Sequence, residues 1–574
     1  MTIMKTRYLK NILAACLFCC GGAVALTSCM SDLDDGNIDP SVQAEPDLTA
    51  LYSKCYACLI LEGMDGDADF SVDNAGKSTF IRNIFYANDL TTDESICWWS
   101  DGGLEDYSVN KQSPSSDHNR YLYHRIITDI SFCNHYLELP GAQADQAKLA
   151  EVRLIRAYLM YQMLDLYGDP TFISGVSSEM PKQAHAYNSN FVEGQSYSRA
   201  ELLQLGRQFL FGWVENELKT AEANLLDPAP KTDSDPNYGR VDKAAAWLLL
   251  SRLYLNAGTY LNDDGQNNSY WAQALEYAEK TINSGYTLFD DSKMSAQAKS
   301  NGYKPYDLLF MGDNGSNGAS CEAIFPLLQD GQKTKAWGGS MFFIASMWQP
   351  SMATVTGLDA GTTANAWSGM RCRPQLIEKF TSNPESFVGK TTAEIRDMTA
   401  DDRAIFWGVD HTLSTMPNDD FNQGISTPKW NNNYSTGGTP HDSYDVDTDF
   451  FLFRVAEAYL NAAEAALHTG AVDKAKQYMD AIRNRAHATV RGSYTLDDVL
   501  DERSRELYFE GIRRPDLIRY NRFGGVNVAY GWEGKGGNDG YTGAPFDKHL
   551  NMFPIPSVEI QANTNLTQID GFNE

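Results

Sequence analysis

The sequence predicts a mostly α-helical protein in which pairs of helices stack on one another and a long loop-rich segment interrupts the stack. Apolar side chains recur every three or four residues over several long stretches, which is the spacing of one face of an α-helix. Alanine gathers on these stretches, where small side chains let helices approach closely. Residues 287–450 differ, because Gly, Asn, Asp, Ser and aromatic residues dominate there and regular segments are short. An irregular segment of that length is usually a functional insertion.

Residues 1–28 predict a secretory signal. Three basic residues precede an apolar run over residues 12–26, which is too short for a membrane span. The run ends in Leu-Thr-Ser-Cys, which resembles a bacterial lipobox and implies cleavage before Cys29 and lipidation of that cysteine. Several acyl chains, at about 0.8 kcal/mol per buried CH2, would anchor the protein stably. The alternative is an ordinary secretory cleavage site with an incidental cysteine.

A polar and acidic stretch follows Cys29, and we interpret residues 29–48 as the lipidated cysteine with a flexible stalk. Acidic residues directly after such a cysteine resemble the surface-export signal of Bacteroidetes lipoproteins. No other hydrophobic run is long enough to span a bilayer. Residues 49–574 would therefore form a soluble body that is tethered to a membrane.

Three helix pairs follow from the apolar spacing within this body. They are predicted at residues 120–139 with 146–169, 241–258 with 271–285, and 450–470 with 471–486. The first helix of the last two pairs ends in a glycine, Gly258 or Gly470, which is a natural residue after a helix. Such pairs resemble tetratricopeptide repeats of about 34 residues, here interrupted by insertions. One pair cannot bury its apolar face alone, so we expect the pairs to stack.

Composition restricts the partners and the chemistry. The net charge of −28 argues against nucleic acid, because phosphate binding needs clustered Lys and Arg. The cysteines beyond residue 29 fit neither a disulfide framework nor a zinc site. Cys55 and Cys58 lie one turn apart in a predicted helix, so we interpret them as buried small apolar residues rather than a redox pair.

We expect a binding protein rather than an enzyme. The sequence holds no H-E-x-x-H, G-x-S-x-G or Walker motif, and its nine histidines are scattered without metal-ligand spacing. A glycosidase needs only two carboxylates, and nothing local marks such a pair. The segment 503–519 mixes Arg and Glu densely, and we interpret it as a structural ion-pair network rather than a catalytic or anion-binding cluster.

Metal binding stays open, and no cofactor is expected apart from the question of a structural calcium. Residues 65–69 resemble the start of a calcium loop, but Phe70 and Gly76 replace its essential Gly and Glu. Residues 313–318 offer only one carboxylate. Asp449 directly precedes a predicted helix and is better explained as its N-cap than as a ligand.

Several segments together resemble the SusD/RagB family of Bacteroidetes outer-membrane lipoproteins. They lie in family order over nearly the whole body: "LTSC", "RLIRAYLMYQMLDLYGDP", "GRVDKAAAWLLLSRLYLNAG", "FRVAEAYLNAAEA", "RSRELYFEGIRRPDLIR" and "FPIPSVEIQANTNLTQ". The resemblance implies a SusD-like fold with four tetratricopeptide-like units and a loop-rich ligand-binding region. It also implies a lipid-anchored location on the outer cell surface. The implied partner is a SusC-like TonB-dependent transporter, for which such a lipoprotein acts as lid and substrate receptor.

The resemblance is sharper toward the starch-binding founding member of that family. "TDESICWWSDGG", "QDGQKTKAWGGS" and "GTTANAWSGM" are similar to segments that carry its glucan-stacking aromatic residues. The resemblance assigns that role to Trp99, Trp337 and Trp367, and a polar binding role to Arg82 in "FIRNIF". One position departs, since Gly102 stands where that protein has a polar side chain.

These residue types suit a sugar for physical reasons. An indole covers the C–H face of a pyranose ring, while polar side chains satisfy the hydroxyls around its edge. A curved set of rings would select a ligand that is already bent, such as an α-1,4-glucan. We therefore expect starch or malto-oligosaccharides as cargo, bound with about micromolar to millimolar affinity. Dextran, fructan, another glycan or a peptide remain alternatives, as does a repeat scaffold without its own ligand.

The adjacent tryptophans divide into two roles in this interpretation. We expect Trp99 to face the ligand and Trp98 to pack beneath as its support. Polar and glycine neighbours suggest that Trp337 is exposed. The competing explanation places all three tryptophans in the core and makes Arg82 a structural salt-bridge partner.

Overall fold

The computed structural model describes residues 47–62, 75–177, 179–357, 359–364, 367–417, 420–525 and 529–572. The predicted signal, Cys29, most of the stalk and the acidic stretch 65–69 lie outside the described residues, so the predicted domain boundaries stay predictions. The chain divides into residues 1–51 and residues 52–574, and the second unit is described below. None of the described helices is both long enough and apolar enough to cross a membrane.

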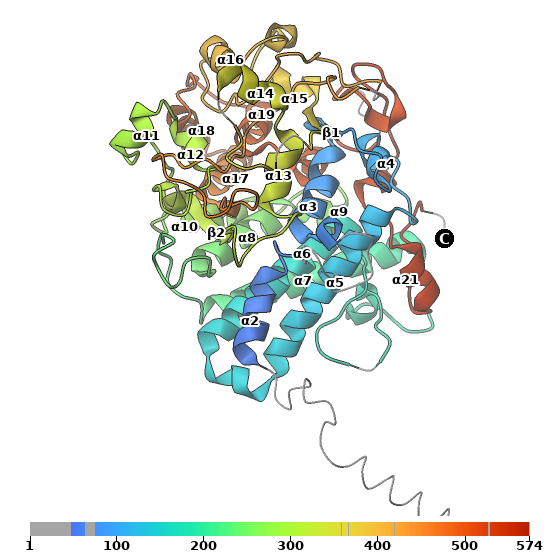
Figure 1. Cartoon of the computed structure of the whole chain (residues 1–574). Helices are drawn as coiled ribbons and strands as arrows, with labels where there is room; N and C mark the ends of the chain where they lie inside the picture. Colours follow the sequence, from blue (N-terminus) through green and yellow to red (C-terminus); the bar gives the residue numbers. More distant parts are fainter. Residues whose placement is uncertain are drawn as a thin grey trace, which may run out of the picture. The chain divides into compact units, whose positions relative to one another are not determined.

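The second unit is mostly helical, as predicted (Figure 1). Its longer helices are α5 (Asp117–Glu138), α6 (Gln146–Tyr167), α7 (Arg199–Glu222), α8 (Lys243–Leu255), α10 (Trp271–Ile282), α17 (Val455–His468), α18 (Val472–Arg485) and α19 (Leu496–Leu507). Consecutive members of the series from α5 to α18 pack on one another. The predicted helix pairs and their stacking are thereby confirmed.

Small side chains bring these helices together. The alanines of α8 and α17 are buried, and α10 packs against both helices. Asp145 accepts a hydrogen bond from the Lys148 backbone (3.1 Å) and caps α6. Gly470 has φ +78° and follows the end of α17, as predicted. Gly258 does not end a helix, because it lies within α9 (Ala257–Asn262), where an added Cβ would come within 2.6 Å of a backbone oxygen.

The helix predicted from residue 450 begins later, and this corrects the sequence prediction. Residues Phe450–Arg454 form strand β4, which pairs antiparallel with β2 (Ala323–Leu327). The run of bulky aromatic residues favours a buried strand, and Phe453 packs edge-on against Phe325 at 5.8 Å. Asp449 is consequently no N-cap. It accepts hydrogen bonds from the Tyr238 hydroxyl (2.6 Å) and the Gln329 backbone (2.8 Å).

The loop-rich region contains only short elements, as predicted. They are α11 (Ala296–Ser300), α12 (Pro305–Leu308), β2, α13 (Ser340–Met347), α14 (Pro350–Thr356), β3 (Met370–Cys372), α15 (Pro374–Glu378) and α16 (Thr392–Thr399). The remaining helices and strand are α2 (Leu48–Ala57), α3 (Phe80–Phe85), β1 (Ser95–Cys97), α4 (Leu104–Ser108), α20 (Arg513–Arg519) and α21 (Ser557–Ala562). Strands β1 and β3 form a second antiparallel pair, which joins the N-terminal part to this region.

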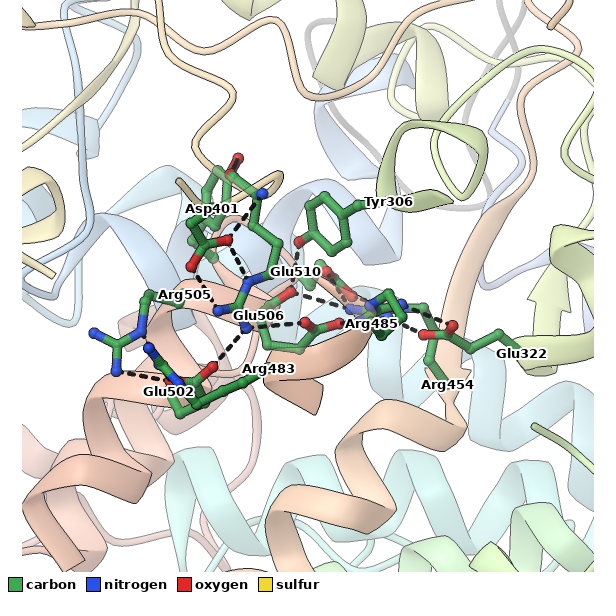
Figure 2. A network of polar contacts seen from close by, with 12 residues as sticks. Tyr306, Glu322, Asp401, Arg454, Arg483, Arg485, Glu502, Arg505, Glu506 and Glu510 are labelled. Carbon is green, nitrogen blue, oxygen red and sulfur yellow. Dashed lines mark hydrogen bonds and ion pairs between the residues drawn. The ribbon is translucent and has the colours of Figure 1, made fainter. Parts of the chain in front are cut away.

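A buried ion-pair network joins the last helices to the loop-rich region (Figure 2). Arg454 of β4 contacts Glu322 (2.5 Å) and Glu506 (3.1 Å), and Arg485 of α18 also contacts both acids. Burial alone would raise the pKa of Glu506, but the surrounding arginines outweigh it and hold that pKa at about 2. The structural interpretation of residues 503–519 is thereby confirmed.

Candidate functional site

The β1–β3 ladder brings two of the predicted tryptophan segments together. Cys97 pairs with Met370, and the Trp98 backbone N–H donates to the Gly369 carbonyl (2.9 Å). Trp98 and Trp99 therefore leave β1 at the same end of the ladder where Trp367 leads into β3. The pairing is antiparallel, so neighbours beyond the last ladder residues stay close.

The two adjacent tryptophans differ in exposure. Trp98 is buried and packs on the half-exposed ring of Phe421 (6.4 Å between centroids), while Trp99 is partly exposed. Trp99 also lies against Gly369, where an added Cβ would come within 2.3 Å of the indole Nε1. Gly369 has φ +110°, a conformation that favours glycine. The backbone at Gly369 thus leaves the space that the Trp99 ring occupies.

Arg82 enters the site from α3, and its surroundings are aromatic. Its side chain is largely buried, and Nε donates to the Tyr86 hydroxyl (2.8 Å). The guanidinium carbon lies 4.8 Å from the ring centroid of Phe342 and 5.8 Å from that of Trp99. Among the described residues Arg82 forms no ion pair with a carboxylate, and its Nη2 group makes no hydrogen bond. Within the described part of the chain, the explanation of Arg82 as a salt-bridge partner is therefore wrong. The Nη2 group of Arg82 remains available as a hydrogen-bond donor at the site.

A structured loop carries Trp337. The Asp330 carboxylate accepts hydrogen bonds from three successive backbone N–H groups, those of residues 332–334 (2.7–3.0 Å). Gly338 then passes the start of α3 so closely that an added Cβ would lie 2.1 Å from the Thr79 hydroxyl. Trp337 is only partly exposed, and its buried Nε1 has no hydrogen-bond partner among the described residues. It is less exposed than its polar neighbours suggested, because this loop is packed onto α3.

Trp367 is also partly exposed and is followed by a tight turn. Ser368 has φ +54°, and its hydroxyl donates to Gln349 (3.0 Å). The nearby Arg371 and Arg373 are buried and donate to backbone carbonyls, such as those of Met370 (2.7 Å) and Ser95 (2.9 Å). Burial lowers the pKa of each guanidinium to about 10. Their bonds to backbone carbonyls fasten β3 to its neighbours.

Phe342 is the residue of this site that the sequence did not reveal. It lies in α13 and is fully buried, with its ring edge-on to Trp99 at 6.1 Å. Because Arg82 contacts the same ring, Phe342 connects α13 with α3 and with the segment that follows β1. We call Trp99, Arg82 and Phe342, together with Trp337 and Trp367 on the adjoining loops, the tryptophan site. Within the described residues the rings of Trp337 and Trp367 make no ring contact with Trp99. The only sequence signal of Phe342 was an apolar pair that follows "WGGS", which looks like ordinary core.

The departure at Gly102 has a structural counterpart. An added Cβ there would come within 2.8 Å of the Asp117 carboxylate, so a side chain at this position would have to displace that carboxylate. Lys77 and Asp101 form an ion pair (3.4 Å) beside the tryptophan loop, with side chains that are 22% and 35% exposed. They place charged groups at the edge of the site that sequence reasoning did not identify.

The tryptophan site offers apolar ring faces beside a few hydrogen-bonding groups, a combination that suits a ligand with both apolar and polar surface. Within the described residues, no three His, Cys, Asp or Glu side chains are grouped so as to hold a metal ion. Asp313, the one carboxylate of segment 313–318, instead accepts hydrogen bonds from Ser435 (2.8 and 2.9 Å). The stretch 65–69 lies outside the described residues, so the question of calcium stays open.

Known proteins match this chain over nearly its whole length. The sequence profile of the SusD family matches residues 397–572. The starch-binding protein SusD of Bacteroides thetaiotaomicron is 32% identical over 610 aligned positions, covering 99% of this chain and 100% of that protein. The SusD-like protein P25 of Formosa agariphila is 24% identical and covers 82% of this chain, with 81% of its own length matched.

Solved structures share the fold. A SusD superfamily protein of Parabacteroides distasonis superposes with a TM-score of 0.61 at 18% identity, covering 92% of this chain and 100% of that one. Surface glycan-binding protein A of Bacteroides uniformis gives a TM-score of 0.61 at 18% identity, covering 91% and 98%. At this identity the likeness concerns the fold alone.

Proposed function

This chain belongs to the SusD family, and from that premise we propose that it is a cell-surface glycan-binding lipoprotein that captures starch or malto-oligosaccharides. The observation that carries the proposal is the meeting of Trp99, Arg82 and Phe342 at one site. A partly exposed indole lies there beside a guanidinium with an available donor group. The 32% identity to a protein named for starch binding supports the choice of cargo.

The physical basis is stacking with a hydrogen-bonding edge. The indole faces would cover the C–H face of glucose, each contact contributing about 0.5–1.5 kcal/mol by analogy with aromatic pairs. The Arg82 Nη2 group and the Lys77–Asp101 pair would meet the hydroxyls. Both parts are held by packed neighbours before any ligand arrives, which lowers the entropic cost of binding.

The rest of the proposed role follows from family membership. Cys29 would carry the lipid that anchors the protein to the outer membrane, and the captured glycan would pass to a SusC-like TonB-dependent transporter. The protein would act by binding, without catalysis and without a cofactor. A polymer that engages several copies at once would bind more tightly than its single contacts suggest.

Affinity electrophoresis in gels with starch, dextran or inulin tests the proposal. We expect starch to retard the wild-type protein, and Trp99→Ala and Trp337→Ala to remove the retardation. Tyr187→Ala is the matched control, because it removes a ring that is 45% exposed and packs instead on Phe172 and Phe209.

Other outcomes would assign a different role. Retardation by dextran or inulin but not by starch would keep the receptor role with another cargo. A complex with the transporter but no retardation by any polysaccharide would favour a scaffold without its own ligand. Appearance of shortened glucan products would contradict the non-enzymatic role.

A further inference from the structure

A cavity lies at the C-terminal end of α13, whereas Trp337 precedes the N-terminal end of that helix. Its volume is about 370 Å³, within the range of small-molecule pockets. Residues that line it include Tyr303, Trp348, Met352, Trp407 and Asn433. We call it the Tyr303 cavity. Phe342 of the tryptophan site and Trp348 of the cavity are six residues apart, which corresponds to roughly 9 Å along a helix.

The aromatic wall of the Tyr303 cavity is rigid. The Trp348 indole N–H donates to the Trp430 carbonyl (2.6 Å), and the Trp407 indole N–H donates to the Ser351 hydroxyl (3.2 Å). Both rings are more than nine-tenths buried. The indole N–H groups of both tryptophans thus donate to other protein groups, and the two rings present carbon atoms to the cavity.

The rim of the cavity carries polar groups without partners. Among the described residues, the Tyr303 hydroxyl, the Asn431 Nδ2 group and the Asn433 Oδ1 atom make no hydrogen bond. The two amides are nevertheless oriented, since Asn431 Oδ1 accepts from the Asn433 backbone (3.0 Å) and Asn433 Nδ2 donates to the Asp359 carbonyl (2.8 Å). A donor, an acceptor and a hydroxyl therefore surround an apolar wall.

The cavity is also electrically balanced. Arg396 and Asp307 line it, and they form an ion pair with each other (3.2 Å between Nη1 and Oδ2). No charged group of the lining is left uncompensated, so the cavity favours neither an anion nor a cation. An apolar protein side chain bound in the cavity would bury the Tyr303 hydroxyl and the two asparagine amide groups without giving them hydrogen bonds. Burying a polar group without a hydrogen-bond partner is unfavourable.

We propose that the Tyr303 cavity is a second binding site, for a neutral pyranose sugar of one or two rings. Carbon surface beside oriented amides suits the C–H face and the hydroxyls of such a ring. Only the choice of glucose as the sugar rests on the proposed function. Two sites on one protein would hold the same polymer more firmly than one.

A blocking variant tests the cavity without removing its internal contacts. Ala393 lines the cavity and is exposed on α16, so Ala393→Trp would fill the entrance. Saturation-transfer NMR with maltose, galactose and mannose would be recorded on wild type, on Ala393→Trp, on Trp99→Ala/Trp337→Ala, and on the triple variant that combines all three substitutions. We expect at least one of these sugars to keep its saturation-transfer signal in the double variant. In the triple variant the signal of that sugar should fall about tenfold.

A second variant protects the test against a folding defect. Tyr303→Phe removes only a hydroxyl, and we expect it to weaken sugar binding in the double-variant background about threefold to tenfold. Unchanged melting temperatures would show that these variants are folded. A crystal of the double variant soaked in the sugar that gives the signal should contain it against Trp348.

The outcomes separate this inference from the proposed function. If Trp99→Ala/Trp337→Ala removes all sugar signal, the cavity inference is overturned while the tryptophan site stands. If Ala393→Trp alone removes all signal, the cavity is supported and the tryptophan site is contradicted. A folded triple variant that still shows the signal of the double variant would also overturn the cavity inference.

Discussion

The ring of Trp99 meets the ring of Phe342 edge-on, with 6.1 Å between the centroids and 68° between the planes. Phe342 is fully buried and also contacts Arg82, so one residue of α13 sets the distance between the indole and the guanidinium. This contact joins two nearby segments, α3 and the residues after β1, to α13, which lies far along the sequence.

Phe342→Leu should separate binding from folding. Leucine nearly conserves the buried volume, so the free energy of unfolding should fall by less than about 1.5 kcal/mol. The lost edge contact should weaken maltoheptaose binding about twofold to tenfold by calorimetry. Phe209→Leu, which alters an aromatic pair with Phe172, is the control. Wild-type affinity in Phe342→Leu would show that Phe342 does not position Trp99.

Gly369→Ala should displace the Trp99 ring. The new Cβ would lie within 2.3 Å of Nε1, so we expect maltoheptaose binding to fall below detection in calorimetry. Gly437→Ala is a matched control, because Gly437 has φ +80° and an added Cβ meets nothing within 4 Å. Both variants should lose about 1–2 kcal/mol of unfolding free energy from backbone strain. Equal binding by the two variants would contradict this account of the site.

Arg82→Lys keeps the charge but changes the geometry. Lysine lacks the planar fork that lets one Arg82 side chain contact Phe342 and Trp99 while Nε donates to Tyr86. We expect glucan affinity to fall about twofold to thirtyfold. Arg120→Lys, at an arginine 4.7 Å from the Tyr121 ring, should leave affinity unchanged. An affinity retained by Arg82→Lys would mean that the charge alone suffices.

Glu506→Gln should reveal the ion-pair network in a pH series. The pKa of Glu506 is lowered from 4.5 to about 2 in the folded protein, so its ionised form stabilises the fold above pH 4.5. That stability is lost as the pH falls from 4.5 toward 2. We expect the variant to be about 3–5 kcal/mol less stable at neutral pH, with the difference shrinking in acid. Urea unfolding at pH 7, 4 and 3 measures this.

Glu276→Gln is the control for that series, since Glu276 is 60% exposed and pairs with Lys280 along one helix turn. It should cost no more than about 0.5 kcal/mol at any of these pH values. A constant difference between Glu506→Gln and wild type down to pH 3 would argue that the lost stability is not electrostatic.

The local spacing of apolar residues predicted the helices correctly. It failed at strand β4, whose pairing partner lies far away in the sequence. The apolar spacing of residues 146–169 is a local property, so it marked α6 correctly. The run at Phe450–Arg454 is equally apolar, and its periodicity does not distinguish a strand from a buried helix. Its pairing with β2 settles the question, and the same pairing takes Asp449 away from a helix cap.

By itself, the sequence determined the helical class, the acidic charge and the loop-rich region, and through resemblance it proposed the three tryptophans and Arg82 as site residues. Only the tertiary structure decided that Trp337 is packed onto α3, that Arg82 is held by aromatic rings and that Phe342 and Gly369 shape the space around Trp99. The reason is physical. Helix periodicity depends on neighbours three or four residues apart, whereas burial and ring contacts depend on segments that meet only when the whole chain has folded.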